Sequence, residues 1–408
     1  MSLFRVFLKP FNDDGTYQDD YIEVTEDVKR ESVGDIRQAI DDDEYEVGVL
    51  KFADFSFELR NENGRYSDVG TEQTIFRYSR AGSKVKVIWQ EQNFEPYAGV
   101  AYCGGTIAGN EEIETFEGLL NDESADSDVM NQGAKFRVLS KESVFSNTET
   151  PFSDIANGDT VKELIVAALS QTLITDLLTV DALNINPGYN AVIDDVSGYE
   201  NSTVKELLDD LLRSSSSVLY VKNDTVYVSA RVIGATLAYE FFGQASNRGL
   251  ENIINLNGIR SGLNKTFNYW TWPETDLLRK DDTSVARYGV RKKEVQVDAI
   301  TTTGTREDIL EALLDQFKDP KQEFTLTTPI NPDTLALNIL DKVKVDYPTV
   351  LFPASGHDIP IYDVSIYDED FYPFEEWTFV VPYEDNYKIM SKNIKTKDQV
   401  LEFILKKE

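Results

Sequence analysis

The sequence predicts a β-rich α+β fold in which two β regions are separated by a helix-containing insert. Apolar residues alternate with polar ones over many short runs in residues 1–150 and again after residue 250. Between these regions the apolar spacing changes to that of amphipathic helices. A chain of 408 residues also exceeds the length that one hydrophobic core usually supports, so several domains are expected.

The first region contains runs typical of strands. In residues 47–68, Phe55, Phe57 and Leu59 fall on one face of a strand, and Gly64 ends the run in a turn that favours positive φ. Residues 31–43 are predicted to form a short helix, because three apolar residues stand at helical spacing. The strands are predicted at residues 3–8, 21–24, 47–68, 84–89, 113–119 and 135–140, with an acidic loop over residues 121–133.

The insert is predicted to hold two amphipathic helices, at residues 160–173 and 202–215. The second begins at Ser202 or Thr203 as N-cap, with Glu206 in the first turn, which resembles a capping box. Both helices carry the letters TVKEL, which we interpret as a coincidence of amphipathic pattern. A β-hairpin with its turn at residues 222–224 follows the second helix.

After residue 250 the alternating pattern returns. A third helix is predicted over residues 305–318, with Thr305 as N-cap and Pro320 just beyond its end. Residues 281–297 are predicted to be a loop leading into a strand, and residues 398–407 a short helix. The remaining strands are predicted at residues 252–260, 263–272, 322–330, 341–348, 360–368 and 376–383. The predicted domains are residues 1–150, 151–250 and 251–385, followed by a C-terminal tail, 386–408.

The composition excludes several classes of function. A formal net charge of −32 opposes direct binding of nucleic acid, although halophilic adaptation also explains such a charge. The only cysteine, Cys103, stands among small residues, and the only histidine, His357, lies in a Pro/Gly-rich stretch. No apolar run approaches 18 residues and the N-terminus lacks a signal-peptide pattern, so we expect a protein made in the cytoplasm without a membrane anchor.

Acidic runs at residues 41–44 and 122–128 contain the oxygen ligands that Ca²⁺ prefers. Neither run has the spacing of an EF-hand loop, so solvated acidic loops are the favoured interpretation. Glu375 and Glu376 precede Trp377 and are the best candidates for a glycosidase carboxylate pair, but the start of a strand is the simpler interpretation. We therefore assign no catalytic, cofactor-binding or metal-binding residue and expect no cofactor.

The aromatic run 267–274 contains Tyr269, Trp270 and Trp272. Such rings can stack on sugars, but they suit a protein core or a subunit interface equally well. We favour the core or interface interpretation and mark these three residues as possible interface aromatics.

Four segments resemble, in order, the tail-hub or baseplate-hub family of tailed bacteriophages. The first is a strand ending in N-x-x-G-R-[FY]-S at residues 55–70, followed by a strand at 77–89 and the Phe116-Glu117-Gly118 strand. The second is the helix and hairpin unit at residues 202–231. The third is S-x-x-x-Y-G-x-R within residues 283–297, and the fourth is the aliphatic segment 330–348. In the fourth segment, Leu340 stands where the family has a glycine.

This resemblance implies a non-enzymatic structural protein. It implies a homotrimer in which two tail-tube-like β-barrel domains per subunit build a pseudo-hexameric ring at the distal end of the tail. The implied partners are the tail tube or distal tail protein, the tape-measure protein and tip or fibre proteins. The genome would pass through the ring without specific binding, and carboxylates in the lumen would repel its phosphates. The alternative is a tail-tip protein that binds carbohydrate or degrades the cell wall.

Overall fold

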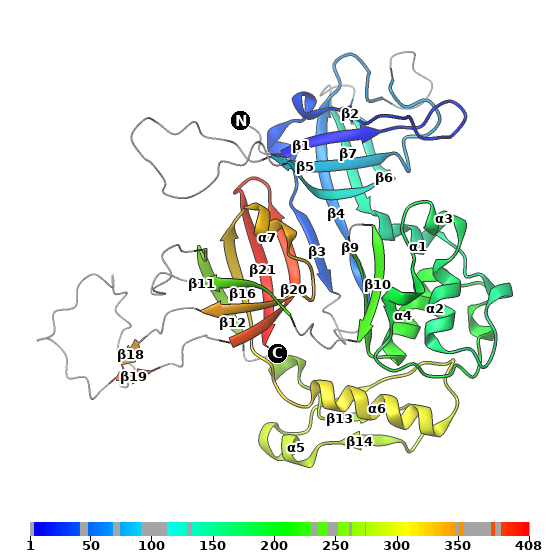
Figure 1. Cartoon of the computed structure of the whole chain (residues 1–408), viewed down its shortest axis with the longest axis vertical. Coiled ribbons are helices and arrows are strands. Elements are labelled where there is room, and N and C mark those ends of the chain that lie inside the picture. The colour runs from blue at the N-terminus through cyan, green and yellow to red at the C-terminus, as the bar shows by residue number, and fades with distance from the viewer. Residues whose placement is uncertain are drawn as a thin grey trace, which may run out of the picture.

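A computed structural model describes most of the chain, and its architecture is drawn in Figure 1. The described residues are 4–40, 48–67, 74–90, 112–128, 133–222, 224–230, 236–242, 252–260, 263–273, 275–346, 351–353, 377–379 and 385–407. They form a large, mostly antiparallel sheet with a helical region beside it. The predicted β-rich α+β class is therefore confirmed.

The first β region is an antiparallel sheet in the order β4-β7-β6-β5-β1-β2. Residues 24–34 link its strands β1 and β4: the Val24 N–H donates to β1 at 2.9 Å, and the N–H groups of Lys29 and Gly34 donate to β4 at 2.8 and 2.7 Å. The strands are β1 (Phe4–Lys9), β2 (Ile22–Glu23), β4 (Gly48–Arg60), β5 (Lys84–Gln90), β6 (Glu112–Asp128) and β7 (Gly133–Ser140), and the linking residues contain two short 3₁₀ helices, η1 (Thr25–Asp27) and η2 (Arg30–Ser32).

Apolar and polar residues alternate along β4, and its apolar face is buried as predicted. Phe55, Phe57 and Leu59 are all buried, and their rings and methyl groups pack in the core of the first β region. Gly64 adopts a φ of +73° in the turn after β4, as predicted. The predicted acidic loop is wrong in part, because β6 continues through Asp128 and pairs again with β7 after a register shift.

The second β region contains six strands in the order β12-β16-β21-β20-β17-β11. Asn252 links the two outer strands: its side chain accepts from the Phe242 N–H at 2.7 Å and donates to the Glu240 carbonyl at 3.0 Å. The strands are β11 (Leu237–Phe242), β12 (Asn255–Arg260), β16 (Glu323–Pro329), β17 (Lys342–Asp346), β20 (Asp385–Lys395) and β21 (Val400–Lys407), and a separate two-stranded sheet contains β18 (Leu351–Pro353) and β19 (Trp377–Phe379). The strand predicted at 360–368 lies outside the described residues.

The helical region combines the insert with residues 263–318, because both contribute side chains to one core. Its helices are α1 (Val144–Asn147), α2 (Val161–Leu169), α3 (Thr172–Thr175), α4 (Val204–Ser214), α5 (Asp282–Tyr288) and α6 (Thr303–Phe317). Its strands are β8 (Ile185–Asn186), β9 (Ser217–Lys222), β10 (Thr225–Ala230), β13 (Tyr269–Thr271), β14 (Leu278–Lys280) and β15 (Lys292–Glu294), and its 3₁₀ helices are η3 (Lys141–Ser143), η4 (Phe152–Asp154), η5 (Ala182–Asn184), η6 (Ser197–Tyr199) and η7 (Leu263–Lys265). No helix in the described ranges is long and apolar enough to cross a membrane.

The two amphipathic helices of the insert form, although the first ends at Leu169 rather than at the predicted residue 173. In α4, Thr203 is the N-cap and forms a capping box with Glu206, and α2 has the same box between Thr160 and Glu163. The predicted apolar faces of both helices are buried, and the two helices pack on each other. The predicted hairpin is β9 and β10.

Several local predictions after residue 262 are wrong. Residues 263–272 begin with a 3₁₀ turn, so only Tyr269–Thr271 are extended, and the predicted loop contains α5. The third helix begins at Thr303 rather than after Thr305, because the Asp194 carboxylate accepts the N–H groups of Thr301 and Thr302 at its N-terminus. The predicted C-terminal helix is strand β21.

One strand, β3 (Ile36–Ile40), joins the two β regions. It pairs with β4 on one side and with β20 on the other, so the described strands form one continuous sheet path, visible in Figure 1 where β3 lies between these strands. Asp35 and Lys395 form an ion pair of 2.9 Å at the end of the β3–β20 ladder. The helix predicted over residues 31–43 is therefore wrong, since cross-strand pairing overrides its helical spacing.

A buried lysine lies where β20 meets the short helix α7 (Pro332–Ala336). Lys392 Nζ donates to the main-chain carbonyls of Leu335 and Leu337, the latter at 2.9 Å. Burial lowers the pKa of Lys392 to about 8, while Asp341 opposes this shift. Nearby, Leu340 has a φ of +70°, so the turn keeps the left-handed conformation of the glycine that the family resemblance expects there.

Lys392 makes the stability of the fold depend on pH. Between pH 8 and 10.5 the unfolded chain holds a proton on this lysine that the folded chain has lost, so the free energy of unfolding rises with pH. We expect the free energy of unfolding of the wild type, relative to that of Lys392→Met, to rise by about 3 kcal/mol over this window. Urea unfolding at several pH values measures it. Parallel pH profiles for the two proteins would contradict the lowered pKa.

Candidate functional site

The aromatic residues marked from the sequence lie in the core of the helical region. Trp270 and Trp272 are 0% and 2% exposed, and both pack among the residues that α6 buries. The Trp270 indole N–H donates to the Phe267 carbonyl at 3.0 Å, and the Arg306 guanidinium lies 5.1 Å from the centre of the Trp272 ring. Neither ring face is open to a sugar, which removes the main support for a carbohydrate platform. Whether half-buried Tyr269 contributes to a subunit interface stays a prediction.

Several other residues considered from the sequence lie outside the described part of the chain. These are Cys103, His357, Glu375, Glu376 and residues 41–44, together with the side chains of residues 122–128. Among the described residues, no group of three histidine, cysteine or carboxylate side chains is arranged to hold a metal ion.

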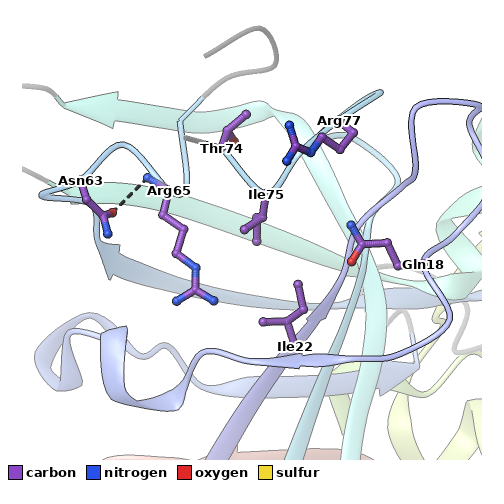
Figure 2. Close-up of a pocket in the computed structure, with 7 residues that line it drawn as sticks. All are labelled: Gln18, Ile22, Asn63, Arg65, Thr74, Ile75 and Arg77. Carbon is purple, nitrogen blue, oxygen red and sulfur yellow. Dashed lines mark hydrogen bonds between the residues drawn. The ribbon is translucent and has the colours of Figure 1, made fainter. Parts of the chain in front are cut away.

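The described part of the chain contains a polar pocket in the first β region, shown in Figure 2. It is a wide, open depression with a volume of about 450 Å³. Three segments form it: the β1–β2 connection, the turn after β4, and the residues before β5. The lining residues are Gln18, Ile22, Asn63, Arg65, Thr74, Ile75 and Arg77.

The turn after β4 fixes one wall of this pocket. Asn61 Oδ1 accepts from the Tyr66 N–H at 2.8 Å, and Asn63 Oδ1 accepts from the Arg65 N–H at 3.1 Å. The Arg65 carbonyl accepts from the Ile75 N–H at 2.9 Å, which ties the turn to the opposite wall. These are the N-x-x-G-R-Y-S residues, so the motif has a structural purpose: it holds Arg65 at the pocket.

Two arginines give the pocket positive charge within an acidic chain. Figure 2 shows the Arg65 and Arg77 guanidinium groups well apart from each other, with Ile75 between them and Ile22 below. Arg65 has one carboxylate neighbour, Asp27, at 3.5 Å. Guanidinium groups bind carboxylates and phosphates through paired N–H donors, so the arrangement can hold an anion; it contains no nucleophile beside a base.

Sequence reasoning did not find this pocket. Its residues come from three stretches between residues 18 and 77, and folding alone brings them together. The turn motif was visible in the sequence, but it carried only the family resemblance. A possible signal was the pair of arginines at 65 and 77 in a chain with 72 acidic residues.

A second charged cluster joins the first β region to the helical region. Lys141 follows β7, and its Nζ lies 2.8 Å from a carboxylate oxygen of Glu117 on β6 and 2.8 Å from one of Asp224 in the β9–β10 turn. The Tyr21 hydroxyl donates to Glu117 as well. The side chains of Lys141 and Glu117 are only 6% and 13% exposed.

The pKa shifts in this cluster agree with a tightly held network. Burial acts to raise the pKa of Glu117, but hydrogen bonds from Lys141 and Tyr21 outweigh it and the pKa is lowered. Burial acts to lower the pKa of Lys141, but its bonds to Asp224 and Glu117 raise the pKa instead. Both side chains therefore stay charged near neutral pH, and the network connects the two regions.

Removing Lys141 would leave a nearly buried carboxylate without its cation. We expect Lys141→Met to lower the free energy of unfolding by about 3 kcal/mol, because an uncompensated buried charge costs more than a lost surface pair. Lys205→Met, which removes a half-exposed pair with Asp209 on α4, is the control and should cost about 0.5 kcal/mol. Urea unfolding of the wild type and both variants measures the two losses in free energy of unfolding. Equal losses in the two variants would show that the junction contributes no more than a surface pair.

Sequence comparison finds no relatives for this chain: no protein-family model matches it, and no curated protein matches it.

Comparison with solved structures finds a similar fold. A tail protein from Neisseria meningitidis MC58 matches with a TM-score of 0.55 and 12% identity, covering 100% of this chain and 96% of that one. The 43 kDa tail protein of prophage MuSo2 from Shewanella oneidensis matches with a TM-score of 0.52 and 11% identity, covering 99% of this chain and 96% of that one. Identities this low establish the fold alone. The chain thus has, over its whole length, the fold of two tail proteins.

Proposed function

We propose that the chain is a structural component of a phage tail. The observation that carries this proposal is the shared fold, which extends over 99–100% of the chain and 96% of each of the two tail proteins. A match of whole chains, rather than of one common domain, supports a similar architectural role. Two features of the structure add support: the tryptophans that suggested sugar binding are buried, and the pocket lacks a catalytic pair.

More specifically, we infer a hub that forms a trimeric ring at the distal end of the tail. Each chain contains two β regions. Residues 24–34 link β1 to β4 in the first, and Asn252 links β11 to the segment before β12 in the second. β3 and β20 join these regions side by side within one sheet path. Three chains would then place six such units around an axis, which suits a connection between a six-fold tube and a three-fold tip.

The charge supports passage of DNA through such a ring. Three copies would carry three times −32, or −96, so carboxylates facing a lumen would repel phosphates and prevent adhesion. In this proposal the partners are the tail tube or distal tail protein, the tape-measure protein and the tip or fibre proteins. The genome passes without specific contacts.

The mass of the protein in solution and its location on the virus particle test the proposal. Light scattering should give three times 46.2 kDa, and negative-stain images should show three-fold rings with an open centre. Gold-labelled antibody on intact particles should mark the distal end of the tail, whether or not the purified chain forms rings by itself. Label along the tube or on the head, or a stable dimer in solution, would refute the hub assignment. Label absent from the particle would refute the structural role altogether.

A further inference from the structure

The sequence contains three Asn–Gly pairs, at residues 63–64, 157–158 and 257–258, and all of them lie in the described ranges. This dipeptide is chemically labile, because the main-chain nitrogen of the glycine can attack the side-chain carbonyl carbon of the asparagine. A glycine has no side chain that would hinder the attack, and it gives the backbone the freedom that ring closure requires. Whether a given pair reacts in the folded chain depends on how its two reacting groups are held.

Hydrogen bonds hold both reacting groups of the first pair. The Asn63 Oδ1 atom accepts from the Arg65 N–H at 3.1 Å, which fixes the side chain on the backbone of its own turn. The Gly64 N–H donates to the Asn61 carbonyl at 3.2 Å, so the nitrogen that would attack is itself engaged in the turn. Ring closure would have to break both of these hydrogen bonds.

The second pair is held in the same way, but through contacts with a more distant segment. The Asn157 Oδ1 atom accepts from the Val196 N–H at 2.9 Å. The Gly158 N–H donates to the Ile193 carbonyl, also at 2.9 Å. Both partners belong to the segment between β8 and α4, so ring closure would have to separate two segments of the helical region.

The third pair lies in β12, the last strand of the described sheet path, which pairs with β16 alone. The ladder shifts register between Asn257 and Arg260, so Gly258 lies in a β-bulge, with a φ of +62°. Asn257 and Gly258 are both exposed, and the Asn257 side chain makes no hydrogen bond with a described residue. Beside the glycine the space is open, since the Thr325 Oγ1 atom would lie 3.7 Å from an added Cβ.

We propose that Asn257 is a site of spontaneous deamidation. The Gly258 nitrogen bonds to the Cγ atom of Asn257 and closes a cyclic imide, while the side-chain amide nitrogen leaves as ammonia and takes the proton that the Gly258 nitrogen loses. Water then opens the imide at either carbonyl, which gives aspartate or isoaspartate. In sum, one water is consumed and one ammonia is released, without an oxidant, a cofactor or an enzyme.

Either product changes the edge of the second β region. Both add a carboxylate to a chain whose net charge is already −32. Isoaspartate also inserts a methylene group into the main chain of β12, which displaces the residues beyond the bulge, where Arg260 pairs with Glu323, relative to β16. The end of β12 therefore loses pairing as the protein ages. This inference does not depend on where in a virus particle the chain lies.

Peptide mapping of the full chain tests the site. The protein is incubated at mildly alkaline pH and physiological temperature, digested under acidic conditions, and analysed by mass spectrometry with fragmentation. In the folded chain Asn257 should deamidate about tenfold faster than Asn63 and Asn157, because hydrogen bonds must break at the other two. In urea all three should react at similar rates, since glycine follows each of them. The proposal is overturned if Asn63 or Asn157 reacts as fast as Asn257 in the folded chain.

A variant separates the reaction from its structural consequence. Asn257→Gln keeps an exposed amide but should not react, because glutamine would have to close a larger ring. After the same incubation, an isoaspartate-specific methyltransferase should label the wild type more strongly than the variant, and hydrogen exchange in β12 should be faster in the wild type. Equal labelling of the two proteins would place the reaction at another residue. Unchanged exchange in β12 despite isoaspartate at residue 257 would refute the loss of pairing.

Discussion

The pairing of β3 with β20 is the constraint on which the rest of the structure depends. Residues 36–39 pair with residues 391–394, so opposite ends of the chain are held in one hydrogen-bonded ladder. Without it, each β region would present an unpaired strand edge at this point, and exposed edges invite pairing with other chains. The ladder also fixes where the helical region sits, because β4 pairs with β3 along one part and with β9 at its beginning.

The spacing of apolar residues predicted those helices and strands in which one face is buried along the whole length of the element. The helices α2 and α4 show a clear 3.6-residue period, and β4 shows a clear two-residue period, so each formed as expected. The strand β3 was missed because the helical spacing of its apolar residues suggested a helix, whereas pairing with β4 and with β20, some 350 residues away, makes the segment extended. In β21 the short, mostly apolar run fits a helix or a strand, and its pairing with β16 and β20 decides for the strand.

The functional residues were less predictable than the fold. Buried tryptophans and stacking tryptophans look alike in a sequence, and only the packing of Trp270 and Trp272 against α6 distinguishes the two. The pocket was not found from the sequence, because an exposed Arg77 is ordinary until Ile75, Gln18 and Arg65 are placed around it. A pocket made from separate loops is a property of the tertiary structure. The left-handed turn at Leu340 was not expected from the sequence either, because a leucine rarely adopts a positive φ.

The link through Asn252 has a mechanical consequence. Strand ladders open only when several hydrogen bonds break together, whereas β11 and the start of β12 are connected through the groups of one residue. Among the described residues, this link therefore rests on fewer hydrogen bonds than a strand ladder does, and we expect it to open more readily than the paired strands on either side.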